Sequence, residues 1–422
     1  MKYELLIIIV LYVLTQAADA ILEYLNFRHL KKHGDEIPEE FKDVITPDLM
    51  TRSKKYTIAK IKFGAYSTVF NQAMTLIFIF GILNYYNDYL HNLNLSFILT
   101  GLIFMMVLTY TKTLLNLPLN FYRVFILEKR FGFNNMTLKL WFFDLIKGFV
   151  VSSILLSVMI VGAFWLIQTL PHIWWLPVWG FFVAFTVFVI YISPYVLEPL
   201  FNKFTPIEDK ELESEIKSVL EKGGINIQGV YRMDASKRTN HSNAYFTGIW
   251  RVKRIVLFDT LLQQLNKEEI IAVLAHEAGH CKKRHVFKNI AIFESLTAIG
   301  AFIAYLVLES SWLTRVFGLT QDTFFAKFIL LSFVATIVLW GMPLFFNSIS
   351  RHFEKQADKF VVKILGSGEA LAAAMVKLSA ENLSNIHPQR LYAKFNYSHP
   401  PLLQRIRYLK RFQAAEANKK SE

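Results

Sequence analysis

The sequence predicts a mainly α-helical, polytopic membrane protein with about seven transmembrane helices and a small cytoplasmic domain that contains a short β-sheet. Three observations support this class. Hydrophobic residues make up 54% of the 422 residues and charged residues only 19%, whereas about a quarter of a soluble protein is charged. The apolar residues gather in seven long segments. The longest polar stretch, residues 198–287, carries the strand candidates.

Each of the seven apolar segments reaches the length of about 20 residues that crosses the hydrocarbon core. They cover residues 4–26, 64–89, 95–117, 147–170, 173–197, 288–309 and 325–349. The first also resembles a secretory signal peptide with a small-residue cleavage site at Ala18-Asp19-Ala20. Because apolar residues resume at Ile21 and continue to Leu25, an uncleaved spanning helix is favoured.

Connections rich in lysine and arginine alternate with connections that are poor in them. Those after the first, third, fifth and seventh segments are rich, those after the second and fourth have none, and the one after the sixth has only Arg315. The positive-inside rule then predicts an outside N-terminus, an inside C-terminus and a cytoplasmic stretch 198–287. The net charge of +13 fits loops beside a lipid bilayer. No nucleic-acid partner is expected, since no zinc finger, basic helix or RNA-binding motif is present.

Within the polar stretch, ELESEIKSVLEKGGI reads as a helix that stops at Gly223-Gly224. GVYRMDA, NAYFTGI and RVKRIVLF are strand candidates, and the last two are expected to join around Gly248. LNKEEIIAVLAHEAGH is a predicted helix, and the tail is expected to be helical and cytoplasmic. The resulting regions are 1–63 (first span and basic loop), 64–197 (spans two to five), 198–287 (cytoplasmic segment with the strand candidates), 288–350 (spans six and seven) and 351–422 (helical tail).

A metal-binding pattern, His276-Glu277-x-x-His280, ends the last helix predicted in the polar stretch. Residues four apart lie on one helix face, so both imidazoles can bind one zinc ion. Glu277 projects beside the metal, where it can take a proton from zinc-activated water and deliver it to the leaving amine. The alternative is a pair of solvated surface histidines. The single cysteine, Cys281, lies about 100° around the helix from His280, so a partly buried thiol is favoured over a nucleophile.

A catalytic zinc ion needs a third protein ligand and an open position. The long metzincin signature is excluded, because Lys283 and Val286 stand where it requires glycine and histidine. His285 follows His280 by five residues and is expected to face elsewhere.

A better candidate for the third ligand follows the seventh segment, in SRHFEKQAD. Glu354 and Asp358 are four apart on one predicted helix face, so Glu354 could bind the metal while Asp358 orients a ligand histidine. His352 is the rival ligand, on nearly the opposite face. From these residues alone, an ordinary charged helix face remains the alternative.

Four stretches in this order resemble the type I CAAX prenyl proteases, integral-membrane zinc proteases of the gluzincin type related to HtpX. They are NFYRVFILEKRFGFNNMTLKLWFFDLIKG at 120–148, then LAHEAGHCKKRH, SRHFEKQADKF and SHPPLLQRI. The resemblance covers almost the whole chain and includes the number of spans. HtpX-type proteases share the zinc motifs but have fewer spans, so they do not account for residues 1–150.

The resemblance implies a complete set of catalytic roles. Glu354 matches the third zinc ligand of the family, and Asp358 matches the acid that orients a ligand. His399 matches a histidine that helps to stabilise the tetrahedral intermediate, and Arg405 matches an arginine near the metal. One zinc ion per chain is therefore expected.

The resemblance also implies where the substrate lies. Asn243, Ala244 and Tyr245 match an edge strand along which the substrate backbone runs, and a peptide can add to such an edge through main-chain hydrogen bonds. The family architecture is a ring of spanning helices around a water-filled chamber that the zinc faces.

The function expected from these observations is a membrane-embedded zinc metalloendopeptidase that removes the C-terminal tripeptide of prenylated proteins. Its partner would be a peptide or protein C-terminus, with or without a prenyl group. The first alternative is an HtpX-like quality-control protease with broad substrates. The second is a metal-binding transporter, which would need ionisable residues along several spans. The expected location is the bacterial inner membrane or the endoplasmic reticulum, depending on the source.

Overall fold

The structure is a computed structural model that describes residues 2–247 and 254–421. In this part of the chain, six helices, counted through short π-helical turns, are long and apolar enough to cross a membrane. They are built from α1 (Lys2–His33), α2 (Pro47–Ile77), α3 (Leu83–Asn92), α4 (Phe97–Tyr122), α5 (Leu138–Thr169), α6 (Trp175–Ile192), α7 (Glu198–Phe201) and α11 (His285–Glu309). Each overlaps one of the first six predicted segments, so these six predictions are confirmed.

The seventh predicted segment differs from the expected continuous span. It forms α13 (Phe324–Val338) and the first part of α14 (Met342–Leu365), and the two helices meet at an angle of 60°. Pro343 lies in the first turn of α14, where its missing N–H costs no helical hydrogen bond. The bend between Leu339 and Gly341 therefore turns α14 away from the direction of α13.

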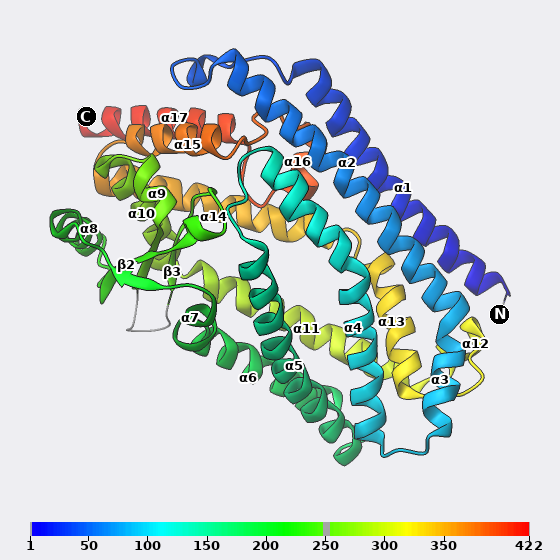
Figure 1. The fold of residues 1–422 in the computed structure, drawn as a ribbon. Helices are drawn as coiled ribbons and strands as arrows, with labels where there is room; N and C mark the ends of the chain where they lie inside the picture. Colours follow the sequence, from blue (N-terminus) through cyan, green and yellow to red (C-terminus); the bar gives the residue numbers. More distant parts are fainter. Residues whose placement is uncertain (1, 248–253, 422) are drawn as a thin grey trace.

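The spanning helices contact one another in a closed ring (Figure 1). In order, α1 packs on α2, α3 on α4, α4 on α5, α5 on α6, α6 on α11, α11 on α13, and α13 packs on α1 again. At most 17% of the most apolar window of any of the six spans is buried. Such low burial is expected for helices arranged in a single layer, because much of each helix surface then lies outside helix–helix contacts.

One end of this ring is closed by an apolar cluster, which we call the aromatic end. Its centre is formed by Phe104 of α4, Phe164 of α5 and Phe325 of α13, and Phe104 is fully buried. The ring of Phe325 lies 5.8 Å from that of Phe104 and 5.2 Å from that of Phe164. Gly101 allows this packing, because a Cβ atom there would lie 2.2 Å from the Phe164 ring.

The polar half of the chain contains a four-stranded sheet in the order β1-β2-β4-β3. Its strands are β1 (Phe204–Pro206), β2 (Gly229–Met233), β3 (Ala244–Thr247) and β4 (Arg254–Phe258). The strands β2, β3 and β4 confirm the three predicted candidates, whereas β1 was not predicted. The expected turn around Gly248 lies outside the described residues. Among the described strands, β3 pairs only with β4, so it is an edge strand.

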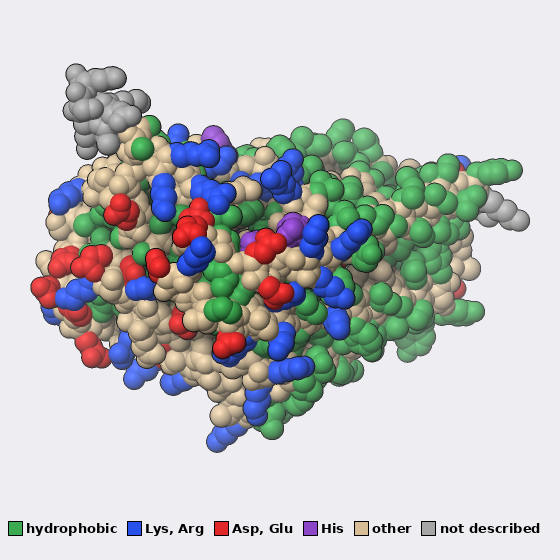
Figure 2. Space-filling view, turned by 90° about the horizontal axis from the view of Figure 1, so that it is seen from above, with side chains coloured by type: hydrophobic (Ala, Val, Ile, Leu, Met, Phe, Trp, Pro, Cys, Tyr) green, Lys and Arg blue, Asp and Glu red, His purple; other side chains and the backbone are tan. Residues whose placement is uncertain are grey.

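Short helices complete the polar half. Those that share a core with the sheet are α8 (Lys210–Lys222), α9 (Asp259–Gln264), α10 (Lys267–Lys282) and α15 (Glu369–Glu381). The helices α16 (Arg390–Asn396) and α17 (Leu402–Ser421) pack on α14, while α12 (Trp312–Phe317) lies at the aromatic end. The predicted helices before Gly223 and through His280 are confirmed as α8 and α10. Figure 2 shows charged side chains over this half of the molecule and apolar side chains over the other half.

Candidate metal centre

Helix α10 carries the histidine pair. It begins with a capping box, in which the Glu269 backbone N–H donates to the Asn266 side chain and the Asn266 N–H donates to the Glu269 carboxylate. Ala272, Leu274 and Ala278 are buried against neighbouring elements. A capped helix packed on these small and apolar residues has a fixed rotation about its axis, and that rotation determines where the two imidazoles point.

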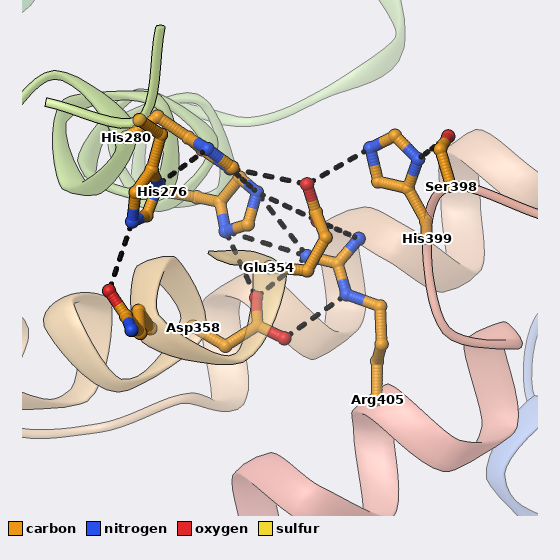
Figure 3. A network of polar contacts seen from close by, with 9 residues as sticks. His276, His280, Glu354, Asp358, Ser398, His399 and Arg405 are labelled. Carbon is orange, nitrogen blue, oxygen red and sulfur yellow. Dashed lines mark hydrogen bonds and ion pairs between the residues drawn. The ribbon is translucent and has the colours of Figure 1, made fainter. Parts of the chain in front are cut away.

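Helix α14 crosses α10 at very close range. A Cβ atom at Gly279 would lie 2.9 Å from the Cα atom of Ala357, so glycine in the HEAGH motif allows the two backbones to approach. Glu354 lies three residues before Ala357 and Asp358 directly follows it, and both carboxylates are buried. The crossing thus brings both carboxylates to the face of α10 that carries the histidines (Figure 3).

His276, His280 and Glu354 converge on one point. The Nε2 atoms of the two histidines are 3.3 Å apart, and they lie 3.3 Å and 3.2 Å from the two carboxylate oxygens of Glu354. Ligands bound at 2.0–2.1 Å in a zinc tetrahedron lie about 3.3 Å from one another. Oε2 of Glu354 is buried and accepts no hydrogen bond. The three side chains therefore have the spacing and the donor atoms that suit a zinc ion.

Asp358 and Arg405 form hydrogen bonds and ion pairs with the side chains of this cluster. Asp358 Oδ1 lies 2.9 Å from Nδ1 of His276, so the Nε2 atom of that ring is left for a metal. The Arg405 guanidinium donates two hydrogen bonds to Asp358, at 2.6 and 3.1 Å, and its Nη1 atom lies 3.3 Å from Glu354. Two buried carboxylates against one guanidinium leave a negative charge, and buried charge is normally paired or bound to a cation.

The two carboxylates also change the acid–base behaviour of His276. Burial opposes a charged imidazole and lowers the pKa of His276, but the contacts with Asp358 and Glu354 outweigh burial and raise the pKa to about 9. Without an ion, a proton therefore occupies His276 at neutral pH. A metal ion must displace this proton, because only the neutral ring offers a lone pair.

Glu277 and His399 border the cluster. Glu277 is half-buried, and its carboxylate makes no hydrogen bond or ion pair within the described residues. His399 comes from the loop before α17, its side chain is 59% exposed, and its Nε2 atom lies 3.2 Å from Oε1 of Glu354. Ser398 contacts the other ring nitrogen at 3.0 Å. Both groups are thus accessible to a molecule that approaches the cluster.

The edge strand β3 packs against α10. Ala244, the first residue of β3, is buried, and the Tyr245 hydroxyl donates a 2.8 Å hydrogen bond to Glu198 of α7. Asn243 immediately precedes the strand, and its carbonyl accepts from the N–H of Phe258 in β4. Among the described strands none pairs with the outer edge of β3, and an edge of this kind suits strand addition by an extended peptide.

The expectation that His285 faces elsewhere is wrong. Its ring is buried, and its Nδ1 atom lies 3.0 Å from Nδ1 of His280. The cause is Arg284, whose left-handed backbone (φ 55°) ends α10 and starts α11 at a new angle. The only signal in the sequence is a third histidine after the motif, and helical spacing alone points that histidine away.

Two other residues considered for this region lie outside the metal ligand cluster. The rival ligand His352 is exposed, and its Nε2 atom accepts a hydrogen bond from the Gln356 amide. Cys281 is partly buried, as expected for a thiol without a catalytic role.

Comparisons with known proteins agree with this arrangement. Residues 26–203 match the family described as CAAX prenyl protease N-terminal, five membrane helices, and residues 206–413 match peptidase family M48. The chain is 32% identical to CAAX prenyl protease 1 of Saccharomyces cerevisiae, covering 91% of this chain and 90% of that protein. It is 33% identical to an Arabidopsis thaliana homologue of that protease, covering 91% and 93%. The crystal structure of Ste24p from S. mikatae superposes with a TM-score of 0.87 at 30% identity, covering 95% and 98%.

Proposed function

This chain belongs to peptidase family M48 and is a multi-pass membrane metalloprotease of the CAAX prenyl protease type, and we propose that it releases the C-terminal tripeptide of prenylated proteins. The observation that carries the proposal is the convergence of His276, His280 and Glu354, with Glu277 next to His276 in the chain and in electrostatic interaction with Arg405. We propose one zinc ion per chain at these three ligands.

The proposed reaction assigns a separate task to each neighbouring side chain. When bound, zinc would supply a Lewis acid that lowers the pKa of water and polarises a carbonyl. Glu277 accepts the proton of the attacking water and returns it to the leaving amine, as its free, half-buried carboxylate allows. Asp358 keeps His276 in the orientation in which Nε2 faces the cluster.

His399 and Arg405 act on the charge of the transition state. His399 stands at the open side of the cluster and donates a hydrogen bond to the oxyanion that develops on the scissile carbonyl. Arg405 stays beside Glu354 and Asp358 and balances their negative charge. Since Asp358 fixes the guanidinium with two hydrogen bonds, this compensation needs no rearrangement during the reaction.

The substrate backbone is proposed to lie along Asn243, Ala244 and Tyr245. The free edge of β3 beside α10 supports this position. A cavity of about 370 Å³ between α6, α11 and α14, lined in part by Asn347 and Ser350, provides space on the membrane side. Ser350 lies one helical turn before Glu354 on α14, so this cavity borders the helix of the third ligand, and we propose it as part of the chamber.

The orientation of the chain follows from its loop charges. With basic connections inside, the metal centre and residues 198–287 face the cytoplasm, and the N-terminus is outside. A catalytic site on this side can meet the C-termini of proteins made in the cytoplasm. The membrane would be the endoplasmic reticulum, or the inner membrane in a bacterium.

The test is peptide cleavage by the purified protein in liposomes. A prenylated CAAX peptide, the same peptide without the prenyl group, and an unrelated unfolded membrane protein are incubated with the enzyme, and products are identified by mass spectrometry. We expect release of the tripeptide from the prenylated peptide, loss of activity with a chelator, and recovery with one equivalent of zinc. Broad cleavage of the unfolded membrane protein with poor tripeptide release would instead favour an HtpX-like quality-control protease. Metal flux without proteolysis would identify a transporter.

A further inference from the structure

A chain of polar contacts leads from His280 away from the metal cluster. Nδ1 of His280 contacts Nδ1 of His285 at 3.0 Å, and Nε2 of His285 contacts Oε1 of Gln356 at 3.0 Å. The Gln356 amide nitrogen then contacts Nε2 of His352 at 2.8 Å. None of these atoms is a proposed metal-binding atom, since His280 would bind the ion through Nε2, and the proposed reaction uses none of them.

Metal binding by His280 requires that the hydrogen bonds in this series be donated in one direction, from His280 toward Gln356. His280 must offer the lone pair of Nε2 to an ion, so its proton must be on Nδ1, which then donates to His285. His285 accepts at Nδ1 and therefore carries its own proton on Nε2, which donates to the carbonyl oxygen of Gln356. If the chain ran in the opposite direction, Nε2 of His280 would carry a proton and could not bind zinc.

We propose that His285 is a positioning residue that fixes the tautomer and ring orientation of His280 for zinc binding, and that Gln356 sets the direction of the chain. This inference rests on the proposed function, because it requires His280 to be a zinc ligand. His285 is suited to the task because it is only 2% exposed and its ring stacks on Phe353, 4.1 Å away and almost parallel. Its orientation is thus determined before an ion arrives.

Helix α14 then orients both ligand histidines by two different routes. Asp358 contacts Nδ1 of His276 directly, whereas Gln356 reaches Nδ1 of His280 through His285. The same helix supplies the ligand Glu354. Loss of a hydrogen-bond partner of a metal-ligating side chain typically lowers metal affinity by about 10- to 100-fold. Loss of the hydrogen bond from His280 to His285 should therefore lower zinc affinity measurably.

Three substitutions of His285 separate positioning from packing. In His285→Asn, the side-chain oxygen takes the place of Nδ1 and can still accept the proton of His280. In His285→Gln, the amide reaches toward Gln356 but leaves His280 without its acceptor. In His285→Phe, the ring keeps the stacking on Phe353 and loses every hydrogen bond. His352→Ala is the matched control, since it removes only the exposed last side chain in this series of polar contacts.

The measurement is zinc affinity of the full-length protein by chelator competition, together with the visible spectrum of the cobalt-loaded protein. We expect His285→Phe and His285→Gln to lose about 10- to 100-fold in affinity, His285→Asn to retain most of it, and His352→Ala to match the wild type. The cobalt spectra of the Phe and Gln variants should shift, because the ligand field of His280 changes.

The result that overturns the proposal is His285→Phe binding zinc as tightly as, or more tightly than, His285→Asn. That order would mean that the stacked ring, and not the acceptor atom, matters. Gln356→Leu provides a second test that leaves His285 in place: we expect weaker zinc binding, and unchanged affinity contradicts the role of Gln356. Failure of the wild-type protein to bind zinc would instead reject the proposed function itself.

Discussion

The two ends of the helical ring are held together by opposite kinds of interaction. At the aromatic end, Phe104, Phe164 and Phe325 pack their rings around Gly101. At the metal end, which we define as His276, His280, Glu354, Asp358 and Arg405, nearly every contact is an ion pair or hydrogen bond. The first arrangement depends on shape and the second on charge.

This difference indicates how the molecule divides its tasks. Helices in lipid gain little from hydrophobic exclusion and associate mainly through close packing, so the aromatic end should control the stability of the ring. The metal end concentrates two buried carboxylates and a guanidinium, which stabilise one another only as a set. Substitutions at the two ends should therefore have separable effects on stability and on activity.

The largest effect is expected from Glu277→Gln. This change removes the proposed general base and keeps the shape of the side chain, so kcat should fall by about 10²- to 10⁴-fold. Because Glu277 makes no hydrogen bond or ion pair within the described residues, the thermal stability and zinc content should stay at the wild-type level. Steady-state kinetics and metal analysis check this prediction, and cleavage at the normal rate contradicts the assigned mechanism.

The converse prediction concerns Phe104→Ala at the aromatic end. Removing a fully buried phenyl ring leaves a cavity and should lower the free energy of unfolding by about 3–5 kcal/mol. Activity per folded molecule should not change. Unfolding in mixed micelles measures the loss, and the matched control is Leu99→Ala, on the same helix at an exposed position. Equal losses of unfolding free energy in both variants would show that the packing of Phe104 does not control the stability of the ring.

Much of this organisation could be predicted from the sequence. Long apolar segments predict seven spans, of which six form continuous helices and the seventh is bent, and the spacing of His276 and His280 predicts two metal ligands on α10. Two features depend on backbone geometry that no residue pattern encodes. His285 meets His280 only because Arg284 adopts a left-handed conformation, which is uncommon for arginine. The bend before Pro343 likewise lies inside an apolar run that hydropathy alone cannot divide.

The third prediction concerns Gly279, where the close packing of α10 on α14 positions the charged side chains of the metal end. Gly279→Val places a side chain against the Ala357 backbone and should push α14 away from α10, at a cost of about 1–3 kcal/mol. Glu354 would move away from the two histidines, so zinc affinity should fall as well. The control is Gly300→Ala on α11, where a Cβ atom meets nothing within 4 Å. Chelator competition distinguishes the two variants, and unchanged zinc binding in Gly279→Val would contradict the role of the helix crossing.

The smallest effect concerns protons at the metal end. Since the pKa of His276 is raised to about 9 in the absence of an ion, zinc binding at pH 7 should release about one proton from this residue. Zinc affinity should therefore fall as the pH decreases below about 9, and this release should disappear above that value. Calorimetry in buffers of different ionisation enthalpy measures the release. Asp358→Asn removes a contact that raises the pKa, so its release should be smaller; equal release in both proteins would contradict the assignment.

The central claim is that α14 completes a zinc site begun on α10, and metal stoichiometry tests it most directly. Zinc per chain is measured by mass spectrometry in the wild-type protein, Glu354→Ala and His352→Ala after purification without added metal. We expect one zinc ion in the wild type and in His352→Ala, and a large loss in Glu354→Ala. Full zinc content in Glu354→Ala, or loss in His352→Ala alone, would contradict the site described for this protein.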